Sequence, residues 1–194
     1  MMRIIVWLLV CFLAASAHGQ ESVRVLIDTE LGEIEVEVDA SKAPGTAVNF
    51  LRYVDENFYD GGQFHRTVTM QNQPNNDVKI EVIQASINET RKDDQFDPIP
   101  LERTTKTGLL HEDGVISMAR DEPDSAASSF FFCIGDQPEL DFGGARNPDG
   151  QGFAAFGRIT RGMDVVKKIQ MSSHEEQRLD PPIRIVSIRR LRIR

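Results

Sequence analysis

The clearest pattern in the chain is a strict alternation of apolar and acidic residues near its beginning. Over residues 33–38 the sequence is EIEVEV, so every second side chain is apolar. A period of two places the apolar residues on one face of a strand and the glutamates on the other. Residues 23–27 alternate in a similar way, and a short connection at 29–32 separates the two segments. The pattern predicts a half-buried antiparallel hairpin.

A helical period follows this hairpin. Apolar residues recur at i, i+3, i+4 and i+7, at Ala47, Phe50, Leu51 and Val54. Pro44 precedes them, at a position that the first helical turn tolerates. We therefore predict an amphipathic helix that starts near Pro44 and is ended by the glycine pair Gly61 and Gly62.

Beyond residue 62 the chain breaks into short apolar runs joined by polar connections. The runs span residues 63–68, 78–86, 114–120, 128–135, 152–159 and 183–193, and a helical pattern covers 162–169. Many short strands with one long early helix are typical of an antiparallel barrel or sandwich whose open ends are covered by helices. We expect one mainly β domain, because 194 residues that are 40% apolar suffice for a single core.

The first 19 residues have the composition of a secretory signal peptide. Arg3 is followed by an unbroken apolar run at 4–15 and then by small residues up to Gly19. This run is shorter than the roughly 20 residues of a bilayer-spanning helix, which favours cleavage over a retained anchor. The run also continues past Cys11, which disfavours a lipoprotein. We therefore expect residues 1–19 to be removed, and residues 20–194 to form a periplasmic or secreted domain without stable membrane insertion.

Charge and cysteine content exclude several classes of function. A formal net charge of −8 gives no general attraction for nucleic acid. After the signal peptide, Cys133 is the single cysteine, so we expect no intramolecular disulfide, and its place in FFFCI is typical of a buried apolar residue. The sequence has no His/Cys cluster or calcium-loop spacing, so we predict neither a metal nor a cofactor. Asn88 begins an NET triplet, which fits a glycosylation acceptor if the source is a eukaryote.

Five short motifs follow one another along nearly the whole mature chain. They are FYDGGQFHR, VIQAS, GVISMAR, SSFFFCIGDQPELD and AAFGRITRGMDVVKKI. In this order the chain resembles the cyclophilin family of peptidyl-prolyl cis/trans isomerases, from about Val23 to Ile188. The resemblance implies a closed eight-stranded antiparallel β-barrel capped by two α-helices. It also implies an enzyme that acts on proline-containing polypeptides and needs no cofactor, and we expect it to be a monomer.

The resemblance assigns catalytic roles to three residues. Arg66 is the guanidinium, Gln84 is the amide that positions the substrate backbone or the arginine, and Phe131 is the floor under the proline ring. An X-Pro bond interconverts over a barrier of roughly 20 kcal/mol, because twisting the amide destroys its resonance. The prolyl nitrogen gains a lone pair as the amide twists. A guanidinium aimed at that nitrogen therefore stabilises the twisted state more than either planar state.

The remaining pocket positions both match and depart from the family pattern. Ala119 and Leu140 match it, and Val82 replaces a usual methionine. Three further positions depart: Arg120 replaces asparagine, Ser129 replaces glutamine and Phe153 replaces histidine. Together these six residues are the predicted substrate-binding set.

Two acidic replacements and two insertions leave two interpretations of the site open. Glu81 and Glu139 stand where the family has phenylalanine and tryptophan, and residues 67–79 and 142–152 are insertions beside the site. The loss of that tryptophan predicts weak binding of cyclosporin-like macrocycles. Glu81 could pair with Arg66 and pull the guanidinium off target. The first interpretation is a divergent isomerase, and the alternative is a peptide-binding or chaperone-like module with little or no turnover.

His65 precedes Arg66 and is the other candidate for the working group. A histidine serves catalysis by moving protons, but prolyl isomerisation transfers none, so the sequence favours Arg66. Neighbouring residues of a regular strand point to opposite faces. If Arg66 faces the groove, we expect His65 to pack on the barrel and to hydrogen-bond to backbone.

Overall fold

The computed structural model describes residues 22–191, so the predicted signal peptide lies outside the described residues. Its strands are antiparallel and form one sheet in the order β1-β2-β7-β5-β6-β4-β3-β9-β8. They span Val23–Thr29 (β1), Gly32–Val38 (β2), Gln63–Val68 (β3), Val82–Ser86 (β4), Val115–Met118 (β5), Phe130–Cys133 (β6), Ala154–Arg161 (β7), His174–Glu175 (β8) and Arg178–Arg190 (β9). A pairing of β1 with β9 closes eight of these strands into a barrel, and the two-residue β8 pairs with β9 beside it.

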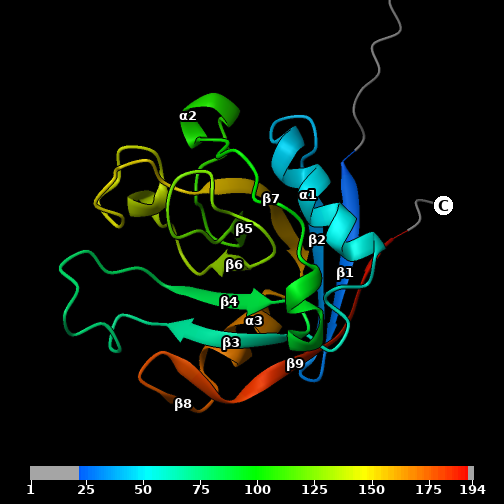
Figure 1. The fold of residues 1–194 in the computed structure, drawn as a ribbon. Helices are drawn as coiled ribbons and strands as arrows, with labels where there is room; N and C mark the ends of the chain where they lie inside the picture. Colours follow the sequence, from blue (N-terminus) through cyan, green and yellow to red (C-terminus); the bar gives the residue numbers. More distant parts are fainter. Residues whose placement is uncertain (1–21, 192–194) are drawn as a thin grey trace, which may run out of the picture.

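The closed eight-stranded barrel is therefore confirmed, and two helices pack against it (Figure 1). The helix α1, Pro44–Asp55, contacts β7 and β9, and the helix α3, Met163–Gln170, contacts β2, β3 and β4. Three shorter helical segments lie in the connections: η1 (Glu89–Asp94), α2 (Thr104–Thr107) and η2 (Pro138–Leu140). The loop between β3 and β4 and the loop after η2 project from the same side of the barrel, away from β1 (Figure 1).

The predicted hairpin forms as the alternation requires. β1 and β2 pair continuously from Val23 opposite Val38 to Thr29 opposite Gly32. Gly32 has φ +134°, and a Cβ there would lie 2.9 Å from Cγ2 of Val165 on α3. A glycine at this position therefore serves both the turn and the packing of α3 against the hairpin.

The helix α1 ends at Asp55, earlier than the predicted end at the glycine pair. Asn57 takes a left-handed conformation with φ +54°, and the Phe58 amide donates to the Tyr53 carbonyl oxygen at 3.0 Å. This turn places Phe58 and Tyr59 in the barrel core, where both are fully buried. The glycines instead allow a close approach to β4, because a Cβ on Gly62 would lie 2.5 Å from a backbone oxygen.

Four predicted strands differ in length from the observed ones, and the runs at 114–120 and 128–135 shorten to β5 and β6. The run at 78–86 pairs as a strand only from Val82 onward. Before it, the Glu81 carbonyl oxygen still accepts from the Ile134 amide at 3.0 Å, whereas the backbone of Val78 and Ile80 is bound by side chains. Gln73 exchanges hydrogen bonds with the backbone of Ile80, and Gln137 accepts from the Glu81 amide. At the other end of the chain, β9 begins at Arg178, before the predicted start at residue 183.

The strands β4, β5 and β6 separate two apolar clusters. Because successive residues point to opposite faces, Phe130 and Phe132 lie in the barrel core, whereas Phe131 and Cys133 lie in a smaller cluster on the outer face. Val68, Ile80, Val82, Val115, Leu140 and Ala155 complete this outer cluster. The outer cluster supports the candidate site.

Candidate functional site

A β-bulge in β3 sets the direction of the Arg66 side chain. Phe64 pairs with Ala85 and Arg66 pairs with Gln84, so β3 advances by two residues while β4 advances by one. Residues 64 and 66 would share a face in a regular strand. The extra residue at the bulge, His65, places Arg66 on the outer face with Gln84, while Phe64 stays fully buried in the barrel core.

The bulge also corrects the expectation for His65. That expectation rested on regular alternation, which does not hold at a bulge. His65 is half-buried, and its Nδ1 atom is buried with no hydrogen-bond partner within residues 22–191. Burial lowers the pKa of the His65 imidazole.

Two glutamine side chains hold the Arg66 guanidinium. Nη1 donates to Oε1 of Gln84 at 3.0 Å, while Nε and Nη2 donate to Oε1 of Gln177 at 3.0 and 2.7 Å. The pairing with Glu81 does not form, because the Glu81 carboxylate accepts from Nε2 of Gln170 at 3.2 Å. Neutral amides thus orient a guanidinium that keeps its full charge.

The positioning residue Gln177 is the part of the site that sequence reasoning missed. It lies between β8 and β9, and its Nε2 donates to the Asn72 carbonyl oxygen at 3.1 Å. Nδ2 of Asn72 donates in turn to the carbonyl oxygens of Thr67 and Glu176, at 3.0 and 2.9 Å. The first insertion therefore supports the side chain that holds Arg66. No local signal marks a partner 111 positions away in the chain.

Phe131 forms a buried floor whose orientation is fixed from below. Its ring stacks on His111, with centroids 6.0 Å apart and planes 12° apart, and it meets Phe153 edge-on at 5.4 Å. Nδ1 of the buried His111 lies 2.7 Å from Oδ1 of Asp141, and Nε2 lies 2.9 Å from Oγ of Ser117. His111 therefore has a supporting role beneath the floor, which sequence reasoning did not anticipate.

All nine residues predicted for the site line one cavity of about 430 Å³. They are Arg66, Val82, Gln84, Ala119, Arg120, Ser129, Phe131, Leu140 and Phe153. The cavity also takes residues that were not predicted, including Ile80, Gln95, Asp121 and Arg146. The fold thus brings a guanidinium, an amide and an aromatic floor to the same open space, and we call this space the groove.

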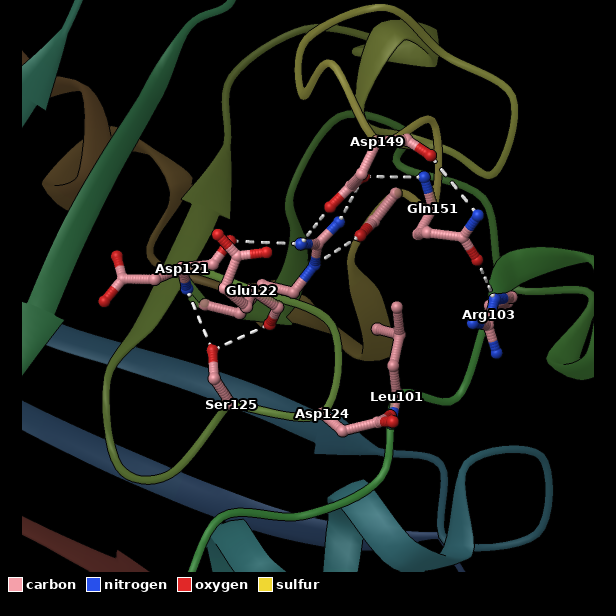
Figure 2. A network of polar contacts seen from close by, with 10 residues as sticks. Leu101, Arg103, Asp121, Glu122, Asp124, Ser125, Asp149 and Gln151 are labelled. Carbon is pink, nitrogen blue, oxygen red and sulfur yellow. Dashed lines mark hydrogen bonds and ion pairs between the residues drawn. The ribbon is translucent and has the colours of Figure 1, made fainter.

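Arg120 is fixed at one side of the groove by an ion pair. Its Nη1 and Nη2 atoms donate to the two carboxylate oxygens of Asp149 at 2.7 and 3.0 Å, and Nε donates to the Gly152 carbonyl oxygen at 2.8 Å. The hydrogen bond from Arg120 holds the pKa of the Asp149 carboxyl below its usual range. Oε1 of Gln151 accepts from Arg103 at 2.7 Å, which extends the network toward α2 (Figure 2). The second insertion is therefore anchored to the groove wall.

Cys133 and Asn88, which the sequence singled out for other chemistry, both lie outside the groove. Cys133 is fully buried, and burial raises the pKa of its thiol strongly, which leaves it unreactive. Asn88 has a structural contact, since its Nδ2 donates to the Asp60 carbonyl oxygen at 2.9 Å.

Within residues 22–191, no three His, Cys, Asp or Glu side chains gather as metal ligands. In the same range, no helix is both long enough and apolar enough to cross a bilayer.

Comparison with known proteins places the chain among the cyclophilins. A peptidyl-prolyl cis-trans isomerase from Acinetobacter baylyi is 39% identical over 81% of this chain and 77% of its own length. Peptidyl-prolyl cis-trans isomerase A from Dickeya dadantii is 35% identical over 79% of this chain and 74% of its own length. A crystal structure of a cyclophilin type isomerase from Cryptosporidium parvum matches with a TM-score of 0.68 and 19% identity, over 90% of this chain and 100% of that one, which supports the fold. The family model described as cyclophilin type peptidyl-prolyl cis-trans isomerase/CLD matches residues 24–190, and the chain belongs to this family.

Proposed function

We propose that this chain catalyses cis/trans isomerisation of X-Pro bonds in extended or partly folded polypeptides, with Arg66 stabilising the twisted amide. The observation that carries the proposal is the placement of the Arg66 guanidinium and the Phe131 ring in one groove. An apolar floor holds the proline ring, and a fixed cation favours the state in which the prolyl nitrogen carries a lone pair. The step transfers no proton and forms no covalent bond to the protein.

The hydrogen bonds of Arg66 suit this role. A guanidinium carries five N–H donors. Gln84 takes one donor and Gln177 takes two, which leaves one N–H on each terminal nitrogen for substrate. Because the two amides already fix the plane of the group, little reorganisation is needed when the amide twists.

The alternative function is a peptide-binding or chaperone-like module with little turnover. The observation that favours it is the polar wall of the groove, where Arg120 is locked to Asp149 and Ser129 replaces a longer amide. Such a groove can hold an extended segment without accelerating its isomerisation.

A proline tetrapeptide assay separates the two functions. The wild type should accelerate isomerisation well above background, Arg66→Ala should lose most of this acceleration, and Arg161→Ala should retain it. Arg161 is an exposed arginine on β7 that pairs with Glu33 and Glu35 and does not line the groove, so it controls for the loss of a charge. Background rates in all three proteins, together with peptide binding, would favour the binding module.

We further propose that the substrates are exported polypeptides, and that the domain acts in the periplasm or outside the cell after removal of residues 1–19. The support is the sequence of that segment, one arginine followed by an apolar run and small residues. Mass spectrometry of the protein from its native cell should give an N-terminus near His18 or Gln20. Intact Met1 on the purified protein would contradict cleavage.

A further inference from the structure

A second arginine of the groove comes from the second insertion. Arg146 lines the same cavity as Arg66. Its Nη1 atom donates to Oε1 of Gln73 at 2.9 Å and to the Val78 carbonyl oxygen at 2.7 Å. Both acceptors belong to the first insertion, so Arg146 joins the two insertions across one end of the groove.

Arg66 and Arg146 have no carboxylate partner in the described part of the chain. All their hydrogen bonds go to amide or backbone oxygens. Arg120, the third arginine of the groove, differs because Asp149 neutralises it. Asp121, the acidic residue among those that line the cavity, stands beside Arg120 in the chain. The end of the groove between Arg66 and Arg146 therefore carries two uncompensated positive charges.

The free edge of Arg146 has the shape that a carboxylate needs. Both N–H groups of Nη1 are engaged, whereas Nε and Nη2 make no hydrogen bond within residues 22–191. These two nitrogens form the side edge of the guanidinium, which binds the two oxygens of a carboxylate in parallel. The contacts through Nη1 hold this edge in place, so little side-chain entropy is lost on binding an anion.

The environment of Arg66 and Arg146 strengthens their attraction for an anion, although the protein as a whole is acidic. Burial lowers the pKa of both guanidinium groups, and the charge of Arg146 lowers the pKa of Arg66 further, so the two cations act on each other. Charges inside a hollow with low-dielectric walls are less screened than charges on an open surface. A bound anion would relieve the repulsion between them.

We propose that Arg146 and Arg66 form an anion-binding end of the groove, which makes this protein prefer X-Pro segments with an acidic side chain beside the proline. The inference rests on the proposed function only in that the groove holds X-Pro segments. Arg146 is then a specificity-determining residue supplied by the insertion.

The test measures binding of matched peptides by NMR titration. Amide-capped tetrapeptides carry Glu or the isosteric Gln, either directly before or directly after proline, and a peptide with a free C-terminus reports on a terminal carboxylate. The wild type should bind the better Glu peptide about five- to tenfold more tightly than its Gln partner, as expected for one partly buried charge pair. This preference should shrink when salt is added.

Three variants assign the preference to Arg146. Arg146→Gln should bring the Glu and Gln peptides to within about twofold of each other, and Arg161→Gln, an equal charge change outside the groove, should leave the preference intact. Arg146→Lys keeps the charge without the planar edge and should retain part of the preference. Thermal unfolding of each variant checks that the insertions remain folded.

Equal affinities of the wild type for Glu and Gln peptides would overturn the proposal. So would a preference that survives Arg146→Gln, a preference shown only by the free terminal carboxylate, or identical behaviour of Arg146→Lys and Arg146→Gln. Because the readout is binding, these results are separate from turnover. A protein that prefers acidic peptides but does not accelerate isomerisation would contradict the proposed function alone.

Discussion

The two faces of β4 and β6 carry different tasks. On the inner face, Phe132 and Ile83 are fully buried in a core of aromatic and aliphatic side chains. On the outer face, the neighbouring Phe131 and Gln84 line an open groove with Arg66. Positions adjacent in sequence therefore belong to different environments, one that stabilises the barrel and one that handles a substrate. Substitutions at neighbouring positions should separate stability from activity.

The largest effect is expected from Phe132→Ala on the inner face. Truncating a fully buried phenylalanine leaves a closed cavity and should lower the free energy of unfolding by about 3–5 kcal/mol. Activity per folded molecule should stay near that of the wild type. Urea unfolding and the peptide assay, run on the same preparation, check both expectations. A large loss of activity in molecules that remain folded would contradict the assignment of stability to the inner face and activity to the outer face.

Phe131→Ala, one position away, should give the opposite result. The truncated side chain borders the open groove, which water can fill, so the loss in unfolding free energy should be only about 1–2 kcal/mol. The acceleration of isomerisation should fall by about a hundredfold, because the floor under the proline ring is lost. If the two alanine variants were equally destabilised and equally active, the comparison would be wrong.

Gln177→Ala tests the support of Arg66 and should have a smaller effect. Two of the three hydrogen bonds on the guanidinium disappear, so kcat should fall about three- to tenfold with little change in KM. Gln151→Ala is the matched control, because its side chain accepts from Arg103 and does not contact Arg66. A general loss of structure would lower the melting temperatures of both variants, whereas a positioning role predicts a selective drop in kcat for Gln177→Ala.

The smallest effect concerns His65, whose pKa is lowered by burial from an ordinary value of 6.5. At pH values between the folded and the unfolded pKa, His65 is protonated in the unfolded chain but neutral in the folded chain. The free energy of unfolding therefore decreases as the pH is lowered through this range. His65→Gln should therefore lose less stability than the wild type when the pH drops from about 7.5 to about 5.5. Urea unfolding at the two pH values measures the difference, and parallel losses in the two proteins would argue against a depressed pKa.

Much of the fold was predictable from local patterns. The alternation at 33–38 gave the β2 strand and its buried face, and the spacing of Ala47, Phe50, Leu51 and Val54 gave the buried face of α1. The ordered motifs gave the family, and with it the nine residues that meet in the groove. These features depend on neighbours in the chain or on a family pattern, which a sequence displays directly.

The rest depended on contacts between distant segments. The bulge at His65 is a matter of register between β3 and β4, and no residue type in QFHRTV reveals it. Gln177 meets Arg66 because β3 pairs with β9, and the Asn72 carbonyl oxygen accepts from its amide. The same holds for Arg146, whose partners lie in the other insertion. Tertiary hydrogen bonds of this kind carry no periodic signal.

The central claim is that Arg66 acts on the twisted amide rather than on binding of the planar peptide. The most direct measurement is the cis/trans exchange rate of a proline peptide at saturating protein, observed by NMR for the wild type and for Arg66→Ala, with Kd measured alongside. The account predicts that the exchange rate of the bound peptide falls by about a hundredfold or more while Kd changes by less than about threefold. Equal exchange rates in the two proteins, or an effect confined to Kd, would contradict it.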